Sequence, residues 1–145
     1  MEIRALELTV TDEDLTHELA EHLPRHAEVK DLRIRVTPEG VRVAGVYPTL
    51  MLAVSFETLW TVAVVDGVVE ARLASIQVAG WQTPGPLRAV IWGMVRDAIP
   101  AQPGIEVGDD AVRVAVAEAL AARGVPLRVR LSAVECGDGV LVVRV

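Results

Sequence analysis

Three histidines and two glutamates gathered near residue 20 are the residues whose types most suggest metal chemistry. They are His17, Glu18, Glu21, His22 and His26. The stretch HELAEH is HExxxH and not the zinc-binding HExxH, and a five-residue spacing turns two side chains about 140° apart on a helix. Pro24 interrupts the helix between His22 and His26. We therefore expect solvated histidines and no metal site.

A lone thiol and two acidic clusters are the other candidates for catalysis. Cys136 lies in a predicted exposed turn without a basic neighbour to lower its pKa, so we do not expect a nucleophile. The acidic clusters, at 12–14 and at Asp109-Asp110, each precede an element where capping explains them. The phosphate-loop pattern GxxxxGK[ST] is absent from the sequence. The sequence thus predicts a protein that is not an enzyme and needs no cofactor.

Arginines on predicted strand faces are the remaining charged feature. They are Arg33, Arg35, Arg128 and Arg130. Alternating arginines usually form a solvated surface, and the alternative is peripheral contact with anionic lipid headgroups.

Composition narrows the function classes. The chain has 145 residues, which fits a single domain spanning 1–145, and a net charge of −6, which argues against a nucleic-acid partner because such binding needs clustered cations. The start, MEIRALELTV, lacks the basic and apolar regions of a secretion signal, and no apolar run reaches the length of a membrane span. With only one cysteine, these features predict a cytoplasmic location.

The stretch 50–81 is the element around which the rest must be arranged. Asp66-Gly67 between two β-branched runs predicts a type I′ hairpin. The register that follows pairs Val65 with Val68, Val64 with Val69, Ala63 with Glu70, Val62 with Ala71, Thr61 with Arg72 and Trp60 with Leu73. Beyond Ser75 the apolar pattern slips by one residue, which predicts a β-bulge near Ala74-Ser75. Arms of this length exceed the usual strand, so we expect the hairpin to curl around another element.

Shorter elements flank this hairpin. Residues 3–10 alternate like a half-buried strand with Leu6, Leu8 and Val10 on one side, and a surface helix follows from about 12 to 23 with Thr11 as its N-cap. LRIRV and VRVAG, joined by a turn at 38–40, predict a second hairpin. The C-terminal part repeats this outline with a helix at AVAEALAARG, a strand at LRVRL, a turn at 136–139 and a closing strand LVVRV.

A helix beginning at Pro86 is more apolar than a surface helix requires. Its apolar residues over 87–99 cover about 200° of the circumference, against the roughly 100° of a surface helix. We therefore expect apolar material on more than one side of it.

The order of these elements resembles the tubular lipid-binding (TULIP) family, with the closest likeness to its small bacterial YceB-like and LmeA-like members. The resemblance rests on the leading strand, the TDEDL helix start, the hairpin LRIRVTPEGVRVAG, the long hairpin and the helix with proline at its start. It implies an α+β fold in which a long, strongly twisted antiparallel sheet wraps around a long helix as a half-barrel. It also implies an apolar groove that can hold acyl chains.

Three interpretations of the surplus apolar residues remain. The first is non-enzymatic binding of a lipid or acyl chain in a groove between the curved sheet and the helix. The residues predicted to line it are Val54, Phe56, Trp60, Val62, Leu73, Ile76, Val78, Leu87, Ile91, Trp92 and Val95. The second is an assembly module whose apolar surface is covered by a protein partner or a second subunit, as in a homodimer. The third is that the same residues close on one another as a core.

We predict that zinc and nickel do not bind stoichiometrically through the histidines, because their spacing does not converge on one ion. Calorimetric titration of the protein with each metal is the measurement. A one-to-one complex of micromolar affinity that is lost in His22→Ala would contradict this prediction.

Overall fold

The fold is given by a computed structural model, which describes residues 2–3, 5–22, 29–48, 53–78, 88–89, 92–93, 95–96, 103–122, 124–126 and 128–145. The elements are β1 (Glu2–Ile3), β2 (Glu7–Thr11), α1 (Asp12–His22), β3 (Lys30–Thr37), β4 (Gly40–Pro48), β5 (Ala53–Val65), β6 (Val68–Val78), β7 (Ile105–Val107), β8 (Ala111–Val114), α3 (Val116–Ala122), β9 (Arg128–Val129), β10 (Ala133–Cys136) and β11 (Val140–Arg144). The protein is α+β, as predicted, and mostly antiparallel sheet.

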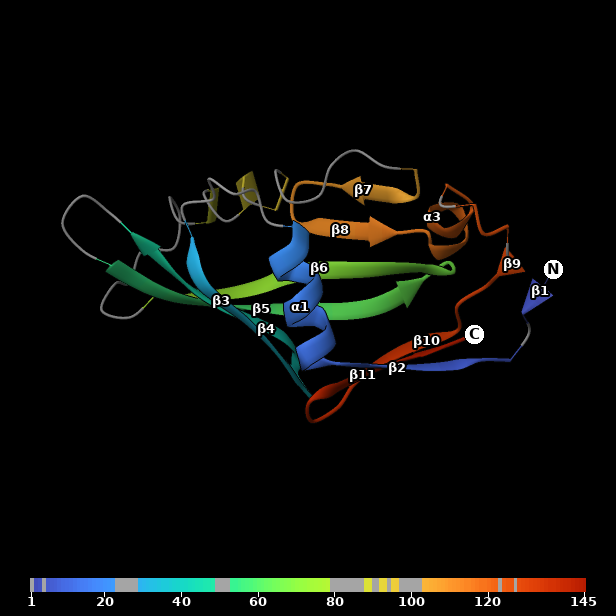
Figure 1. Cartoon of the computed structure of the whole chain (residues 1–145), viewed down its shortest axis with the longest axis horizontal. Coiled ribbons are helices and arrows are strands. Elements are labelled where there is room, and N and C mark those ends of the chain that lie inside the picture. Colours follow the sequence, from blue (N-terminus) through green and yellow to red (C-terminus); the bar gives the residue numbers. More distant parts are fainter. Residues whose placement is uncertain are drawn as a thin grey trace.

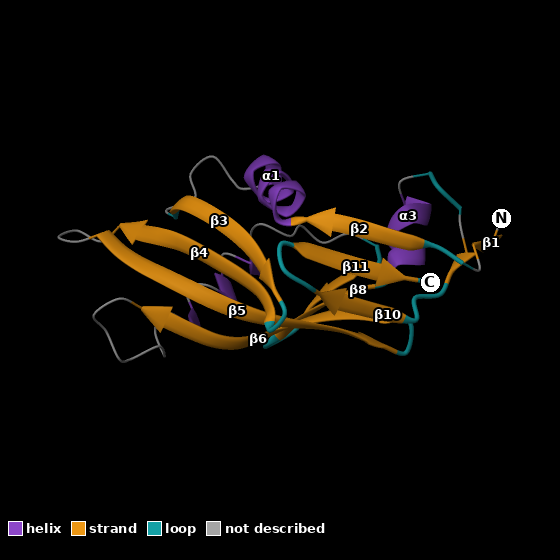
Figure 2. Ribbon diagram, turned by 90° about the horizontal axis from the view of Figure 1, so that it is seen from below, coloured by secondary structure: helices purple, strands orange, loops and turns teal. Residues whose placement is uncertain are grey.

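The described strands form one large and two small sheets (Figure 1). The large sheet has the order β3-β4-β5-β6-β8-β7, and a three-stranded sheet has the order β10-β11-β2. The third is a parallel pairing of β1 with β9. Seen from below, the strands of the large sheet bend along their length, while β2, β11 and β10 lie at the right of the view, at the end that carries both termini (Figure 2).

The long β5–β6 hairpin has the register that the sequence predicts. Every predicted pair from Val65–Val68 to Trp60–Leu73 is present, and the turn residues Asp66 and Gly67 have φ of 52° and 78°. Beyond these pairs Leu59 faces Ser75, so Ala74 is the extra residue of a β-bulge. The bulge is confirmed. It brings Ile76 and Val78 to the apolar face, where they pair with Thr58 and Phe56.

The second predicted hairpin is also confirmed, as β3 and β4. The pairs run from Thr37–Gly40 to Lys30–Val46, with an irregularity between Lys30 and Arg33. β4 continues along β5 as far as the pair Pro48–Ala53, so the two hairpins share one continuous apolar face. Val36 on β3 is completely buried.

Helix α1 begins as the sequence predicts. The Thr11 hydroxyl accepts a hydrogen bond from the Asp14 N–H (3.2 Å), and the Asp14 carboxylate accepts one from the Thr11 N–H (3.0 Å), which is a reciprocal cap. The described side chains of α1 are exposed or half-buried, as expected of a surface helix. Thr16 lies against the outer edge of β3, where its hydroxyl accepts from the Ile34 N–H at 3.2 Å. The helix thereby covers part of an edge that would otherwise be open.

The N-terminal strand differs from the prediction. The stretch 3–10 is not one strand, because Glu2–Ile3 pairs with β9 while Glu7–Thr11 pairs with β11 in another sheet. Leu6 and Leu8 are exposed and not half-buried, since β2 is the outermost strand of its sheet. The expectation of a half-buried strand was therefore wrong for these two residues.

The C-terminal part contains the predicted helix and closing strand, but the strand that pairs with the closing strand is not the predicted one. Helix α3 and the closing strand β11 lie where predicted, but the partner of β11 is β10 (Ala133–Cys136), not LRVRL. Arg128–Val129 of LRVRL instead pairs with β1. Gly139, in the β10–β11 turn, ties the sheets together: its N–H donates to the Val36 carbonyl oxygen (2.8 Å), and its carbonyl oxygen accepts from the Asp12 N–H (3.1 Å).

We predict that Gly40→Ala destabilises the protein strongly. Gly40 has φ of 147°, and an added Cβ would overlap the Trp60 carbonyl oxygen in the paired strand. Strain of this kind costs about 1–3 kcal/mol. The measurement is the free energy of unfolding in urea.

The matched control is Gly93→Ala, which adds the same methyl group at a helical position with no atom within 4 Å of the new Cβ. Alanine stabilises a helix interior by up to about 1 kcal/mol over glycine, so this variant should be at least as stable as the wild type. Equal losses in both variants would contradict the structure at Gly40.

Candidate functional site

The apolar face of the long hairpin meets the segment near residue 92 in one buried cluster. Phe56, Trp60, Leu73 and Trp92 are each at most 9 % exposed. The rings of Trp60 and Trp92 stack with centroids 5.8 Å apart and planes inclined by 22°. The structure thus brings together four of the residues predicted to line a groove, and in the middle of the face these residues fill the space between sheet and helix.

The polar atoms within this cluster are satisfied. The Trp60 indole N–H donates to the Thr58 hydroxyl (2.9 Å), which donates to the Val43 carbonyl oxygen (3.0 Å). The Trp92 indole N–H donates to the Gly108 carbonyl oxygen at 2.7 Å. Sequence reasoning did not include Thr58, although it alternates with Phe56 and Trp60 and is 1 % exposed. These bonds fix the orientation of both indoles, so the cluster offers no described buried donor in need of a ligand.

The margin of the face is less covered than its centre. Of the other predicted residues, Ile76, Val78 and Val95 are half-buried against the cluster. Val54 and Val62 are also half-buried and lie on the same face of β5. Leu87 and Ile91 lie outside the described residues. Near them, the described residues 88–89, 92–93 and 95–96 are helical, in agreement with the predicted helix.

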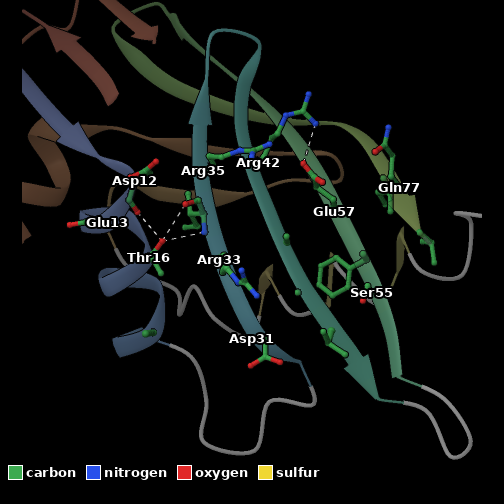
Figure 3. Close-up of a pocket in the computed structure, with 18 of the residues that line it drawn as sticks. Asp12, Glu13, Thr16, Asp31, Arg33, Arg35, Arg42, Ser55, Glu57 and Gln77 are labelled. Carbon is green, nitrogen blue, oxygen red and sulfur yellow. Dashed lines mark hydrogen bonds and ion pairs between the residues drawn. The ribbon is translucent and has the colours of Figure 1, made fainter. Parts of the chain in front are cut away.

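A groove of 1620 Å³ is lined by α1 and by the strands β3, β4, β5 and β6 (Figure 3). Phe56, Ile76 and Val78 of the predicted ligand site line it, together with polar side chains of the same strands. Arg35 stands directly opposite Arg42 on the neighbouring strand, and Arg42 is neutralised by Glu39 (2.6 Å) and Glu57 (3.2 Å). Acidic side chains, Asp12, Glu13, Asp31 and Glu57, line the groove together with the arginines. The mixed charge favours a solvated surface, which is what the alternation of Arg33 and Arg35 predicts.

The metal and thiol candidates acquire no site among the described residues. The Nε2 atom of His17 lies 3.0 Å from the Glu21 carboxylate on the exposed face of α1. Among the described residues, no group of three or more His, Cys, Asp or Glu side chains could hold a metal ion. The side chain of His22 and all of His26 fall outside the description. Cys136 ends strand β10 and is half-buried, not exposed as predicted, and burial raises its thiol pKa. A raised pKa disfavours the reactive thiolate.

Glu70 is the centre of an ion-pair network on β6 and β8. Its carboxylate, 14 % exposed, accepts hydrogen bonds from Arg72 (2.7 Å) and Arg113 (3.0 Å), which lower its pKa, the Arg72 bond having the larger effect. Arg72 also pairs with Asp110 at 2.8 Å. The sequence assigned Asp109-Asp110 to capping, and this was wrong: the two residues form the turn between β7 and β8. The network links β6 to β8, and the lowered pKa of Glu70 disfavours this carboxyl group as a proton donor.

Comparison with known proteins identifies no relative: the chain matches no family model, no curated protein and no solved structure. Within the described ranges, none of the helices has the length and apolar character needed to cross a membrane.

We predict that Glu70→Gln destabilises the protein at neutral pH and that this difference disappears in acid. A carboxylate with a lowered pKa in the folded state stabilises the fold above its ordinary pKa, near 4.5, and this contribution is lost as the pH falls through the lower folded value. Urea unfolding at a series of pH values measures both effects. Glu118→Gln, at an exposed position in the first turn of α3, is the control: it removes a carboxylate that no described ion pair holds, so both effects should be much smaller. A constant difference between Glu70→Gln and wild type at every pH would refute the network.

Proposed function

We propose that this protein binds an apolar ligand, a lipid or acyl chain, along the apolar face of its long hairpin, without catalysing a reaction. In this proposal the curved sheet and the helix near residue 92 act as the TULIP-like half-barrel that the order of elements suggests. The observation that carries the proposal is the incomplete cover of this face. The stacked Trp60 and Trp92 close its centre. The aliphatic side chains at its margin are only partly buried, namely those of Val54, Val62, Ile76 and Val78.

The accessible surface of the whole chain supports the same conclusion. It amounts to 9375 Å², about 30 % more than the roughly 7,200 Å² of a compact monomer of this size. Each large aliphatic side chain gains about 1.5–3 kcal/mol on full burial, which is free energy available to a ligand that covers the margin.

The alternative is an assembly module in which a second subunit or a protein partner covers the apolar surface. One observation favours it: Leu8 on the outermost strand β2 and Leu6 just before this strand are exposed, in a different sheet from the long hairpin.

We predict that protein purified without detergent carries extractable lipid in native mass spectrometry, and that oleate changes the Trp60 and Trp92 fluorescence. Ala71→Trp should weaken oleate uptake several-fold, because Ala71 packs on the apolar cluster and a larger side chain fills space for the ligand. Bound oleate is counted by native mass spectrometry, which an added tryptophan does not disturb.

The matched control is Ala63→Trp, at an exposed position on the opposite, polar face of β5. It should leave uptake unchanged, and circular dichroism should show that both variants are folded. A clean apo mass together with no fluorescence response to oleate would overturn the proposal. If the protein is then found to be a dimer that Ile76→Lys dissociates, the assembly alternative is favoured, with the second subunit on the apolar face of the long hairpin.

A further inference from the structure

The free edge of β2 is the least protected edge among the described strands. Leu8 is 54 % exposed and Leu6, just before the strand, is 48 % exposed. Proteins protect sheet edges with proline, lysine, bulges, short strands or a covering element. β3 is covered by Thr16 of α1, and β7 and β10 have only three and four residues. β2 contains no proline or lysine, and its pairing with β11 is continuous.

The hydrogen bonds of β2 show which of its backbone groups point outward. The Val145 N–H donates to the Leu6 carbonyl oxygen (3.0 Å), and the Asp12 N–H donates to that of Gly139 (3.1 Å). In an antiparallel ladder hydrogen-bonded pairs recur every second residue, so Leu6, Leu8 and Val10 bond to β11. Glu7, Thr9 and Thr11 therefore turn their N–H and C=O groups to the free edge. The Thr11 N–H is taken by Asp14, which leaves Glu7 and Thr9.

We infer that the β2 edge pairs antiparallel with β2 of a second copy of this chain, with Leu8 on the two-fold axis. In this register Leu8 faces Leu8, and Leu6 faces Val10, so the exposed leucines become cross-strand apolar pairs. The Glu7 and Thr9 backbone groups of each copy bond to those of Thr9 and Glu7 in the other. The two three-stranded sheets join into one sheet of six strands.

Charge and chemistry select this register over its neighbours. An axis at Glu7 would set two carboxylates directly opposite each other, which is unfavourable. An axis at Thr9 would place Leu6 opposite Asp12 at the start of α1. With the axis at Leu8, Glu7 faces Thr9, and its charge is already balanced by Arg144 of its own chain at 3.2 Å. A homodimer suits an edge whose sequence complements itself, because a two-fold interface uses the same patch twice.

This inference rests on the assembly alternative and not on the ligand. The pairing uses the edge of the small sheet and leaves the margin of the long hairpin uncovered. A dimer through β2 and a lipid on the hairpin are therefore compatible, and the experiments for each fail independently.

Light scattering over a wide range of protein concentration tests the inference on the full chain. The wild type should become dimeric as the concentration rises, and Leu8→Lys should remain monomeric with unchanged circular dichroism. Val65→Lys is the matched control, since Val65 has the same 48 % exposure as Leu6 but lies at the tip of the long hairpin. It should dimerise like the wild type. A monomeric wild type at every concentration, or equal loss of the dimer in both variants, would overturn the inference.

Disulfide cross-linking tests the register. A directly opposed, non-hydrogen-bonded pair has Cα atoms about 4.5 Å apart, within the range that a disulfide spans. Leu8→Cys in a Cys136→Ser background should therefore form a covalent dimer on mild oxidation, whereas Val65→Cys in the same background should not. Absence of the Leu8 cross-link in a protein that dimerises would refute the β2 register and leave the assembly alternative standing.

Discussion

The register of the β5–β6 hairpin is the constraint on which the rest of the fold depends. It is set by the Asp66-Gly67 turn, whose two positive φ values match the twist of a two-residue hairpin. A slip of one residue would place Leu73 on the opposite face of the sheet from Phe56 and Trp60 and would break up the buried cluster that they form. β4 pairs with β5 and β8 pairs with β6, so the positions of both strands in the sheet depend on the register of this hairpin. The bulge at Ala74 then keeps the far end of the ribbon in phase, since it restores Ile76 and Val78 to the apolar side.

The stacked Trp60 and Trp92 hold the helical segment near residue 92 against the centre of the long hairpin. Trp60 and Trp92 stack, and each indole N–H bonds to a neighbouring acceptor, which fixes the approach of the helical segment to the sheet. Toward the margins the apolar side chains are only half-buried, and α3 has no fully buried residue. The apolar burial that stabilises this fold is therefore concentrated at the centre of the face.

The treatment of the sheet edges differs between the two larger sheets. In the large sheet α1 covers part of β3, and the hydroxyl of Thr16 satisfies the outward Ile34 N–H. In the small sheet the outward backbone groups of Glu7 and Thr9 on β2 have no described partner strand, and the exposed Leu8 lies between them. Gly139 joins the two sheets through hydrogen bonds to Val36 and from Asp12, so any partner held at β2 would be coupled to the large sheet through a short and direct connection.

Local chemistry determined much of this protein from its sequence alone. The Asp-Gly turn, the slip near Ser75 and the Thr11 cap each act between close neighbours, and for that reason the hairpin register, the bulge and the start of α1 could be predicted. Tertiary structure decided what has no local signal. Arg128–Val129 pair with β1 and not with the closing strand, Asp110 forms an ion pair with Arg72, and Thr58 is buried beside Trp60. It also decided that Leu6 and Leu8, which alternate like buried residues, stand exposed. Alternation indicates which side chains share a face, but only the packing of distant segments determines whether that face is covered.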